Sequence, residues 1–235
     1  MKHWSIILSL AVISGACKKD DNKESGDYKC TTCITLPEAK EQHNNSSAGV
    51  YKGVMVGSTG TIALYLYNTG TEVKALATFD GKNATLTTTD LANWTPGQAI
   101  SNARFKGTIN NQEMNAVFSV GANGQNPSVQ VTIPGHTVVV AIYKETSSSL
   151  IKNFEGTYQG DASGIFNITF NGSSYTLVRD GGVAPANATL INGNVELTSN
   201  GILIKGSFNG TDVIEGTWKE ISTGTHGTWK GNRTL

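Results

Sequence analysis

The closely spaced cysteines in Cys30-Thr31-Thr32-Cys33 could support redox or metal chemistry. A redox pair of this spacing sits where a strand meets a helix, and the residues from Asp27 to Pro37 show no such pattern. A zinc site needs a second group of ligands, but no further cysteine pair follows and the histidines are far apart in the sequence. We therefore predict a disulfide between Cys30 and Cys33, as expected in an oxidising compartment.

Histidine-based catalysis has two candidates, because His136 and His226 are the histidines of the region after residue 49. A nucleophilic triad needs a histidine that a carboxylate orients beside an exposed nucleophile. His136 follows Pro134 and Gly135, and His226 precedes Gly227. Both are predicted to be turn residues without a catalytic role.

The acidic residues show no spacing that selects a catalytic pair, which glycoside hydrolysis would require across a cleft. The runs that begin at Asp80 and Asp180 supply too few oxygen ligands for calcium, and no glycine loop with its Lys and Ser or Thr is present to hold phosphate. We predict no catalytic residue, no metal, no cofactor and no enzymatic activity. The scattered acids are Glu155, Asp161, Asp180, Glu196, Asp212, Glu215 and Glu220.

Three tryptophans, Trp94, Trp218 and Trp229, are the candidate ligand contacts. An indole ring offers a large apolar surface with one polar N–H, so it can line an apolar cavity or form a platform for a sugar. Two of the three end the repeated steps Gly216-Thr217-Trp218 and Gly227-Thr228-Trp229. Core packing is the alternative role for each ring.

The N-terminus has the three-part layout of a secretory signal peptide. A basic start, Met1 to His3, precedes the apolar run Trp4 to Ile13 and the small residues Ser14 to Ala16. The run is shorter than the roughly 20 apolar residues that a membrane-spanning helix needs. We therefore predict a signal peptide over residues 1–16.

The cysteine that follows, in Ser14-Gly15-Ala16-Cys17, resembles the lipobox of bacterial lipoproteins, although Ser14 stands where leucine is usual. The resemblance implies that Cys17 is lipidated and becomes the first residue of the mature protein. The next residues, Lys18-Lys19-Asp20-Asp21, resemble the sorting signal of surface-exposed lipoproteins of the Bacteroidota. Together they imply a lipid anchor in the outer membrane, on the cell surface rather than the periplasmic face.

The charge balance argues against nucleic acid as a partner, because 18 basic and 18 acidic residues leave no strong overall field. Charged residues make up only 15% of the chain, and Gly, Thr, Ser and Asn are abundant, which favours strands and turns over surface helices. Residues 17–48 are polar and have few apolar side chains. We predict that they form the lipidated N-terminus and a flexible tether.

Two short matches indicate that the rest of the chain is duplicated. Gly49 to Gly53 (GVYKG) resembles Gly156 to Gly160 (GTYQG), and Phe105 to Asn110 (FKGTIN) resembles Ile204 to Asn209 (IKGSFN). Both matches occur in the same order in the two halves. We therefore predict two related modules.

Within each half, apolar residues recur at every second position, as in half-buried strands. Phe166, Ile168 and Phe170 form one such face, and Asn200-Gly201 between two alternating runs predicts a tight hairpin. Runs of this kind suggest roughly eight strands per half and no convincing helix. The predicted fold is all-β, an antiparallel meander that forms two related barrel-like or sandwich-like modules over residues 49–150 and 151–235.

The glycine-then-tryptophan steps are similar to those of small up-and-down barrels such as lipocalins and avidins, a likeness that concerns architecture alone. Small barrels can enclose a ligand. We expect a surface lipoprotein that binds a small apolar molecule or a glycan through Trp94, Trp218 or Trp229. The alternative is a scaffolding, adhesion or enzyme-inhibiting lipoprotein that contacts another surface protein and has no small-molecule ligand.

Overall fold

The computed structural model describes residues 28–56, 60–179 and 186–235. This part of the chain contains sixteen strands and one short 3-10 helix, η1 (Glu41–His43), which confirms the predicted all-β class. The predicted signal peptide and Cys17 lie outside the described residues. None of the described helical segments has the length and apolar character needed to cross a membrane.

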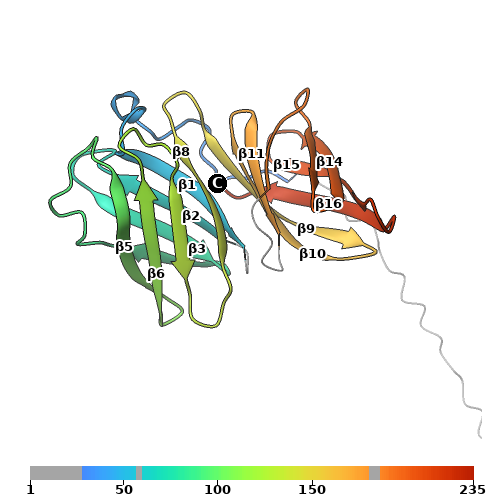
Figure 1. The fold of residues 1–235 in the computed structure, drawn as a ribbon, viewed down its shortest axis with the longest axis horizontal. Coiled ribbons are helices and arrows are strands. Elements are labelled where there is room, and N and C mark those ends of the chain that lie inside the picture. Colours follow the sequence, from blue (N-terminus) through green and yellow to red (C-terminus); the bar gives the residue numbers. More distant parts are fainter. Residues whose placement is uncertain (1–27, 57–59, 180–185) are drawn as a thin grey trace, which may run out of the picture.

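The first module is a split barrel of two antiparallel sheets (Figure 1). One sheet has the order β4-β3-β2-β1-β8 and the other the order β5-β6-β7. A bridge between Thr87 and Lys106 links the two sheets, and the last strand pairs with the first. The strands are β1 (Gly49–Val56), β2 (Gly60–Leu66), β3 (Val73–Phe79), β4 (Lys82–Leu86), β5 (Ile100–Ile109), β6 (Gln112–Val120), β7 (Ser128–Thr132) and β8 (Val139–Glu145).

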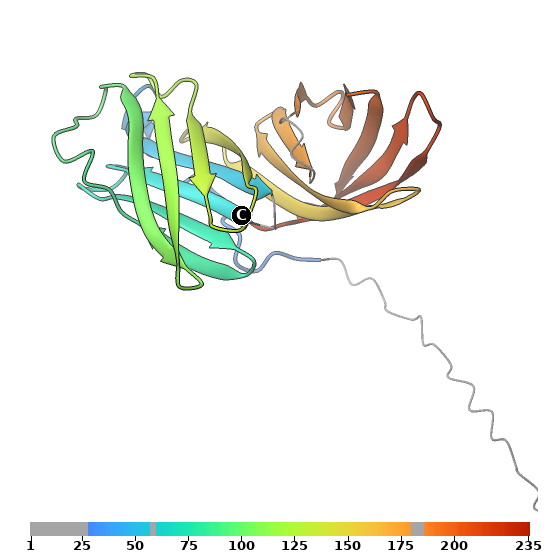
Figure 2. The ribbon, with the colours of Figure 1, turned by 60° about the horizontal axis from the view of Figure 1, so that its bottom comes forward.

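The second module is a single eight-stranded antiparallel sheet with the order β12-β11-β10-β9-β16-β15-β14-β13. The sheet curls until its end strands β12 and β13 come into contact, which makes a nearly closed barrel (Figure 2). The strands are β9 (Ile151–Gly160), β10 (Gly164–Asn171), β11 (Ser174–Arg179), β12 (Ala186–Thr189), β13 (Val195–Ser199), β14 (Ile202–Asn209), β15 (Val213–Glu220) and β16 (His226–Arg233).

The two modules are related in topology, since each has eight strands in up-and-down order and its last strand pairs with its first. Gly53 and Gly160, which the first sequence match aligns, both lie against the last strand of their module, since a Cβ atom on them would lie 1.9 Å from the Ala141 oxygen and 2.5 Å from the His226 oxygen. The FKGTIN and IKGSFN segments fall on the fifth and sixth strands respectively, so they are not equivalent.

The predicted hairpin at Asn200-Gly201 joins β13 to β14, where Ser199 pairs with Ile202. Both turn residues have positive φ, 50° at Asn200 and 76° at Gly201. Asparagine and glycine tolerate this conformation at lower cost than other residues, so the hairpin prediction is confirmed.

Residues 28–48, here called the strap, do not form the flexible tether predicted over residues 17–48. Beside the second module, the Tyr28 hydroxyl donates to the Arg233 carbonyl oxygen at 2.8 Å. The Cys30 N–H donates to Asp212 Oδ2 at 3.1 Å. Cys30 and Cys33 form the predicted disulfide, with a Cα–Cα distance of 5.4 Å, and it lies in this contact rather than at the base of a free tether.

The strap then crosses to the first module. The N–H groups of Glu38 and Ala39 donate to Glu145 Oε1 at 2.7 and 3.3 Å, and the N–H of Lys40 donates to Asn68 Oδ1 at 3.1 Å. A polar segment can therefore be ordered without a core of its own, because buried side-chain acceptors elsewhere in the chain satisfy its backbone donors. Any tether is confined to residues before Tyr28, which lie outside the described residues.

A buried ion pair joins the strap to both modules. Lys52 Nζ lies 2.8 Å from Glu145 Oε2, and both side chains are fully buried. The same ammonium lies 2.8 Å from Glu38 Oε2 in the strap, and Glu145 Oε2 also accepts the N–H of Ile151 at 3.2 Å, at the start of β9. One carboxylate thus connects the strap, β1, β8 and β9.

The modules pack directly against each other, and the C-terminus lies between them (Figure 1). Val54, Ala141 and Val178 belong to one apolar cluster that spans the boundary. Asn153 Nδ2 donates to the Gly53 oxygen at 2.9 Å, and Asn167 Nδ2 donates to the Met55 oxygen at 2.8 Å. These buried contacts make the two barrels one unit.

Replacing Glu145 by Leu should lower the free energy of unfolding by about 3–5 kcal/mol, because it leaves a buried ammonium without its buried partner. Urea unfolding at neutral pH measures the change. The matched control is Glu72→Leu, which removes an exposed partner of Lys74 and should cost less than about 1 kcal/mol. Equal losses in the two variants would show that the buried pair does not hold the strap and modules together.

Candidate ligand-binding pocket

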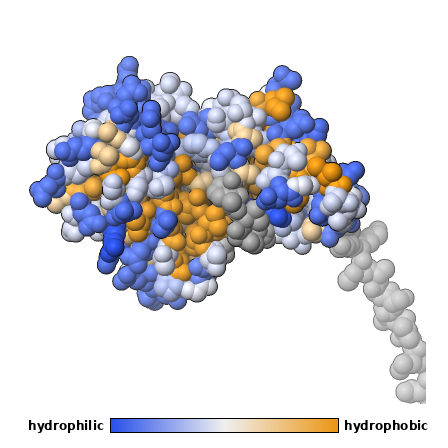
Figure 3. Space-filling view, viewed as in Figure 1, coloured by the Kyte–Doolittle hydropathy of each residue, from blue (hydrophilic) through white to orange (hydrophobic). Residues whose placement is uncertain are grey.

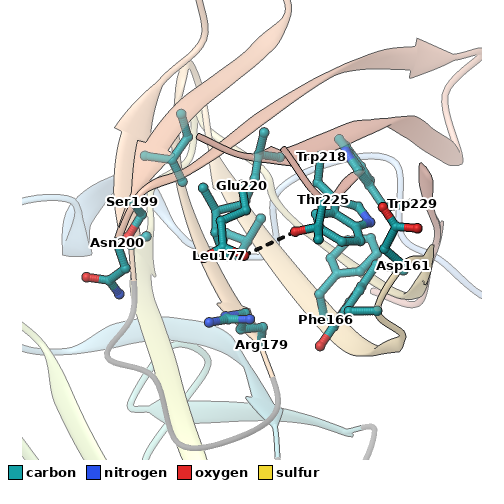
Figure 4. Close-up of a pocket in the computed structure, with 16 residues that line it drawn as sticks. Asp161, Phe166, Leu177, Arg179, Ser199, Asn200, Trp218, Glu220, Thr225 and Trp229 are labelled. Atoms are coloured by element: carbon teal, nitrogen blue, oxygen red, sulfur yellow. Dashed lines mark hydrogen bonds between the residues drawn. The ribbon is translucent and has the colours of Figure 1, made fainter. Parts of the chain in front are cut away.

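The second module contains a pocket of about 440 Å³ at one end of its barrel (Figure 4). The volume lies within the range of about 300–1,000 Å³ typical of small-molecule sites. Every strand of the barrel contributes to the wall, so the pocket is the barrel lumen. Its lining residues are Tyr158, Asp161, Ala162, Phe166, Leu177, Arg179, Ala186, Leu197, Ser199, Asn200, Ile202, Ile204, Trp218, Glu220, Thr225 and Trp229.

Trp218 and Trp229, both predicted as ligand contacts, form part of this wall. The Trp229 ring meets Phe166 edge to face at a centroid distance of 5.3 Å, and the Trp218 ring meets Tyr158 at 6.1 Å. Both indole N–H groups donate to backbone oxygens, Trp218 to that of Gln159 at 3.2 Å and Trp229 to that of Thr217 at 3.1 Å. With their N–H groups bonded, the two rings offer the lumen apolar surface.

Glycines on β14 and β16 make room for these rings. A Cβ atom on Gly206 would lie 2.2 Å from Trp229 Cζ2, and one on Gly227 would lie 2.5 Å from Trp218 Nε1. Any larger residue would collide with the ring, since real carbon contacts are not this short. Trp218 on β15 thus lies against Gly227 on the adjacent strand β16, whereas Trp229 on β16 reaches across β15 to Gly206 on β14.

The barrel interior also holds a cluster of aromatic side chains. Phe170 contacts Phe154, Phe208 and Tyr175 at centroid distances of 5.6, 5.1 and 5.5 Å. None of these four rings lines the pocket, so the aromatic cluster occupies another part of the barrel interior.

The first module, by contrast, is filled by its own side chains. Its core cluster has 24 buried hydrophobic residues, against 10 in the cluster of the second module. Trp94, the third predicted contact, belongs to this filled core and does not line the pocket. Its ring lies 5.4 Å from that of Tyr67, and its Nε1 donates to the Gln98 oxygen at 3.0 Å. Trp94 therefore packs in the core of the first module.

The mouth of the pocket carries two carboxylates that already have hydrogen-bond donors. Glu220 accepts hydroxyl hydrogens from Thr223 at 2.9 Å and from Thr225 at 3.1 Å, and these bonds lower the pKa of the Glu220 carboxyl. Asp161 Oδ2 accepts the backbone N–H of His226 at 2.9 Å. His226 is the first residue of β16 and pairs with Lys219, so it is a strand residue and not the turn residue that was predicted.

Arg179 also lines the mouth and was not predicted as a site residue from the sequence. It pairs with the inward-facing Phe166 across β10 and β11, so it lies on the inner face of the barrel. The signal was present in the sequence, because Tyr175, Leu177 and Arg179 alternate along one strand. A strand whose inner face ends in arginine places a cation at the rim of the cavity.

Other ionisable groups lie away from the pocket. Burial lowers the pKa of Lys144 to about 8, and its ammonium donates to the Ala48 oxygen at 2.6 Å at one end of the first module. His136 stacks edge to face on Phe79 at 4.9 Å, between β7 and β8, where a turn residue was predicted. Among the described residues, no group of three or more His, Cys, Asp or Glu side chains could hold a metal ion.

Comparisons with protein-family models, with curated proteins and with solved structures find no match to this chain. The functional inference therefore depends on the geometry of the pocket.

Replacing Gly206 by Ala should displace the Trp229 ring and destabilise the protein by about 1–3 kcal/mol, as overpacking a filled site does. Near-ultraviolet circular dichroism should show the altered indole environment, and urea unfolding the loss of stability. Ser207→Ala, on the exposed side of the same strand, should change neither signal. A Gly206→Ala variant with native stability and spectrum would contradict the proposed packing of Trp229.

Proposed function

We propose that the second module binds a small apolar or amphipathic molecule in its lumen. The observation that carries the proposal is the open cavity of about 440 Å³ with apolar side chains on its walls. Tyr158, Leu197, Ile202 and Ile204 face this cavity and are only partly buried, although they pack on the core of the module. Covering such surface contributes about 25 cal/mol per Å² of apolar area removed from water, so a ligand that fills the lumen gains affinity.

The orientation of the tryptophans favours such a ligand over a glycan. A sugar platform on a sheet would require an indole face open to solvent, but Trp218 and Trp229 are only 9% and 4% exposed. Both rings face the inside of the barrel. The apolar part of a ligand could contact them only by entering the lumen.

A contact with another surface protein is the second candidate function, and a different surface supports it. β7 and β8 share no ladder among the described strand pairs. Near this seam, Val138, Val140 and Ile142 are only partly buried. Figure 3 shows hydrophobic residues gathered on this face of the first module, toward the boundary with the second. A scaffolding or adhesion partner would cover such a surface.

We further propose that the protein is a lipoprotein of the outer membrane, anchored through Cys17 and exposed at the cell surface. The signal-like segment, the lipobox-like residues and the Lys and Asp residues after Cys17 support this location. The membrane would then be a partner through the N-terminal lipid. Because the strap begins at Tyr28 beside the second module, the anchored segment would lead first to the module with the pocket.

Binding can be tested with N-phenyl-1-naphthylamine, a neutral apolar probe whose fluorescence rises in apolar surroundings. The protein should give a saturable increase. Leu197→Trp, which fills the lumen, should abolish it, whereas Thr198→Trp should leave it unchanged, because Thr198 is exposed and successive side chains point to opposite faces of a strand. If wild type shows no saturable signal, or if Leu197→Trp binds as well as wild type, the lumen is not the site.

Substituting Cys17 by Ser should release the protein from membranes, because a serine cannot carry the thioether-linked lipid. Fractionation of cells that express each form, followed by immunoblotting of the membrane and soluble fractions, measures the change. Membrane association that persists in the Cys17→Ser variant would contradict the lipoprotein assignment.

A further inference from the structure

The polar groups at the mouth of the pocket indicate which charge a bound ligand carries. This inference rests on the proposed function. Six of the lining residues are polar or charged: Asp161, Arg179, Ser199, Asn200, Glu220 and Thr225. An amphipathic ligand that fills the apolar lumen would place its polar end among them. The polar end is best matched to a group that lacks a partner among the described residues.

Both carboxylates already accept hydrogen bonds, Glu220 within its own loop and Asp161 from the first residue of β16. Glu220 accepts hydrogen bonds from the hydroxyls of Ser222, Thr223 and Thr225. Asp161 accepts the N–H of His226, whose ring Nδ1 also lies 3.5 Å from Asp161 Oδ2. A cationic ligand would therefore compete with donors that are already in place.

Arg179 differs from the two carboxylates in its hydrogen bonding. Its guanidinium makes no hydrogen bond and no ion pair with any residue in the described part of the chain. Glu220 is near enough for the charge of Arg179 to act on it, yet the two side chains form no salt bridge. Arginine offers five N–H donors in a planar fork and no acceptor. The rim therefore holds a set of donors that the described residues leave unused.

The position of Arg179 suits a ligand that enters the lumen. Leu177, two residues earlier on the inner face of β11, is buried and belongs to the apolar wall, whereas Arg179 is half-buried at the rim. Figure 4 shows Arg179 beside Leu177 and apart from Asp161, which lies toward the tryptophans. An anionic group on Arg179 would thus stay clear of the Asp161 carboxylate while the attached apolar chain follows Leu177 inward.

We propose that the pocket takes an amphipathic anion, a carboxylate with an apolar body, and that Arg179 binds the carboxylate. The planar guanidinium can hold both oxygens of a carboxylate through two parallel hydrogen bonds. The apolar body lies between Leu177 and the rings of Trp218 and Trp229. Arg179 is then the residue that determines headgroup specificity, and the lumen supplies the binding energy of the chain.

Three probes with one chain length test the proposal, namely decanoate, decanol and decylamine, each titrated by isothermal calorimetry at pH 7.5. Decanoate should bind more tightly than decanol by about tenfold or more, the contribution expected of hydrogen bonds to a charged group. Arg179→Gln should remove this preference, and a native urea-unfolding midpoint shows that the variant is folded. Arg104→Gln removes the same charge from an exposed position on the first module and should keep the preference.

The possible negative results distinguish a failure of the anion specificity from a failure of the proposed function. Equal binding of decanoate and decanol, or a preference that survives in Arg179→Gln, would overturn the role of Arg179 while the lumen remained a binding site. Tighter binding of decylamine than of decanoate would also overturn the role of Arg179. It would indicate that the carboxylates at the mouth bind a cationic headgroup. If none of the three probes binds, both the anion specificity and the proposed function are wrong.

Discussion

The interior volume of an eight-stranded barrel is the constraint on which the rest of this structure depends. Such a barrel is just wide enough for its own side chains to fill, or to hold one small ligand. The first module fills it with large residues such as Tyr51, Phe105 and Phe118. In the second module, the inner-face glycines 206 and 227 lie against tryptophan rings, and the space at one end stays open. The same topology thus gives one packed barrel and one with a cavity.

The packed barrel supports the open one. β10 is buried on both faces, because Phe166 and Ile168 face the lumen while Asn167 faces the first module and donates to the Met55 oxygen. A pocket wall that is backed by another barrel cannot relax outward when a ligand enters. The strap and the Lys52–Glu145 pair hold the two barrels in this arrangement, so the first module contributes to the site without touching it.

Period-two alternation and turn residues predicted the strands and the hairpin at Asn200-Gly201, because these depend on local sequence. Local signals could not predict that the strap is ordered, since its partners Glu145 and Asp212 lie more than a hundred residues away in sequence. They also could not separate Trp94 from Trp218, because Trp94 lies in the loop between β4 and β5, where no alternation indicates what an indole contacts. Arg179 could have been found from the alternating run that it ends, but the lack of an ion pair between it and any described residue could not.

The indole ¹H–¹⁵N resonances of the tryptophans test the central claim most directly, because they report on both modules at once during a titration with decanoate. The account predicts that the signals of Trp218 and Trp229 shift together and saturate, while that of Trp94 stays in place. A shift at Trp94, or no shift at either pocket tryptophan, would contradict the assignment of the binding site to the lumen of the second module.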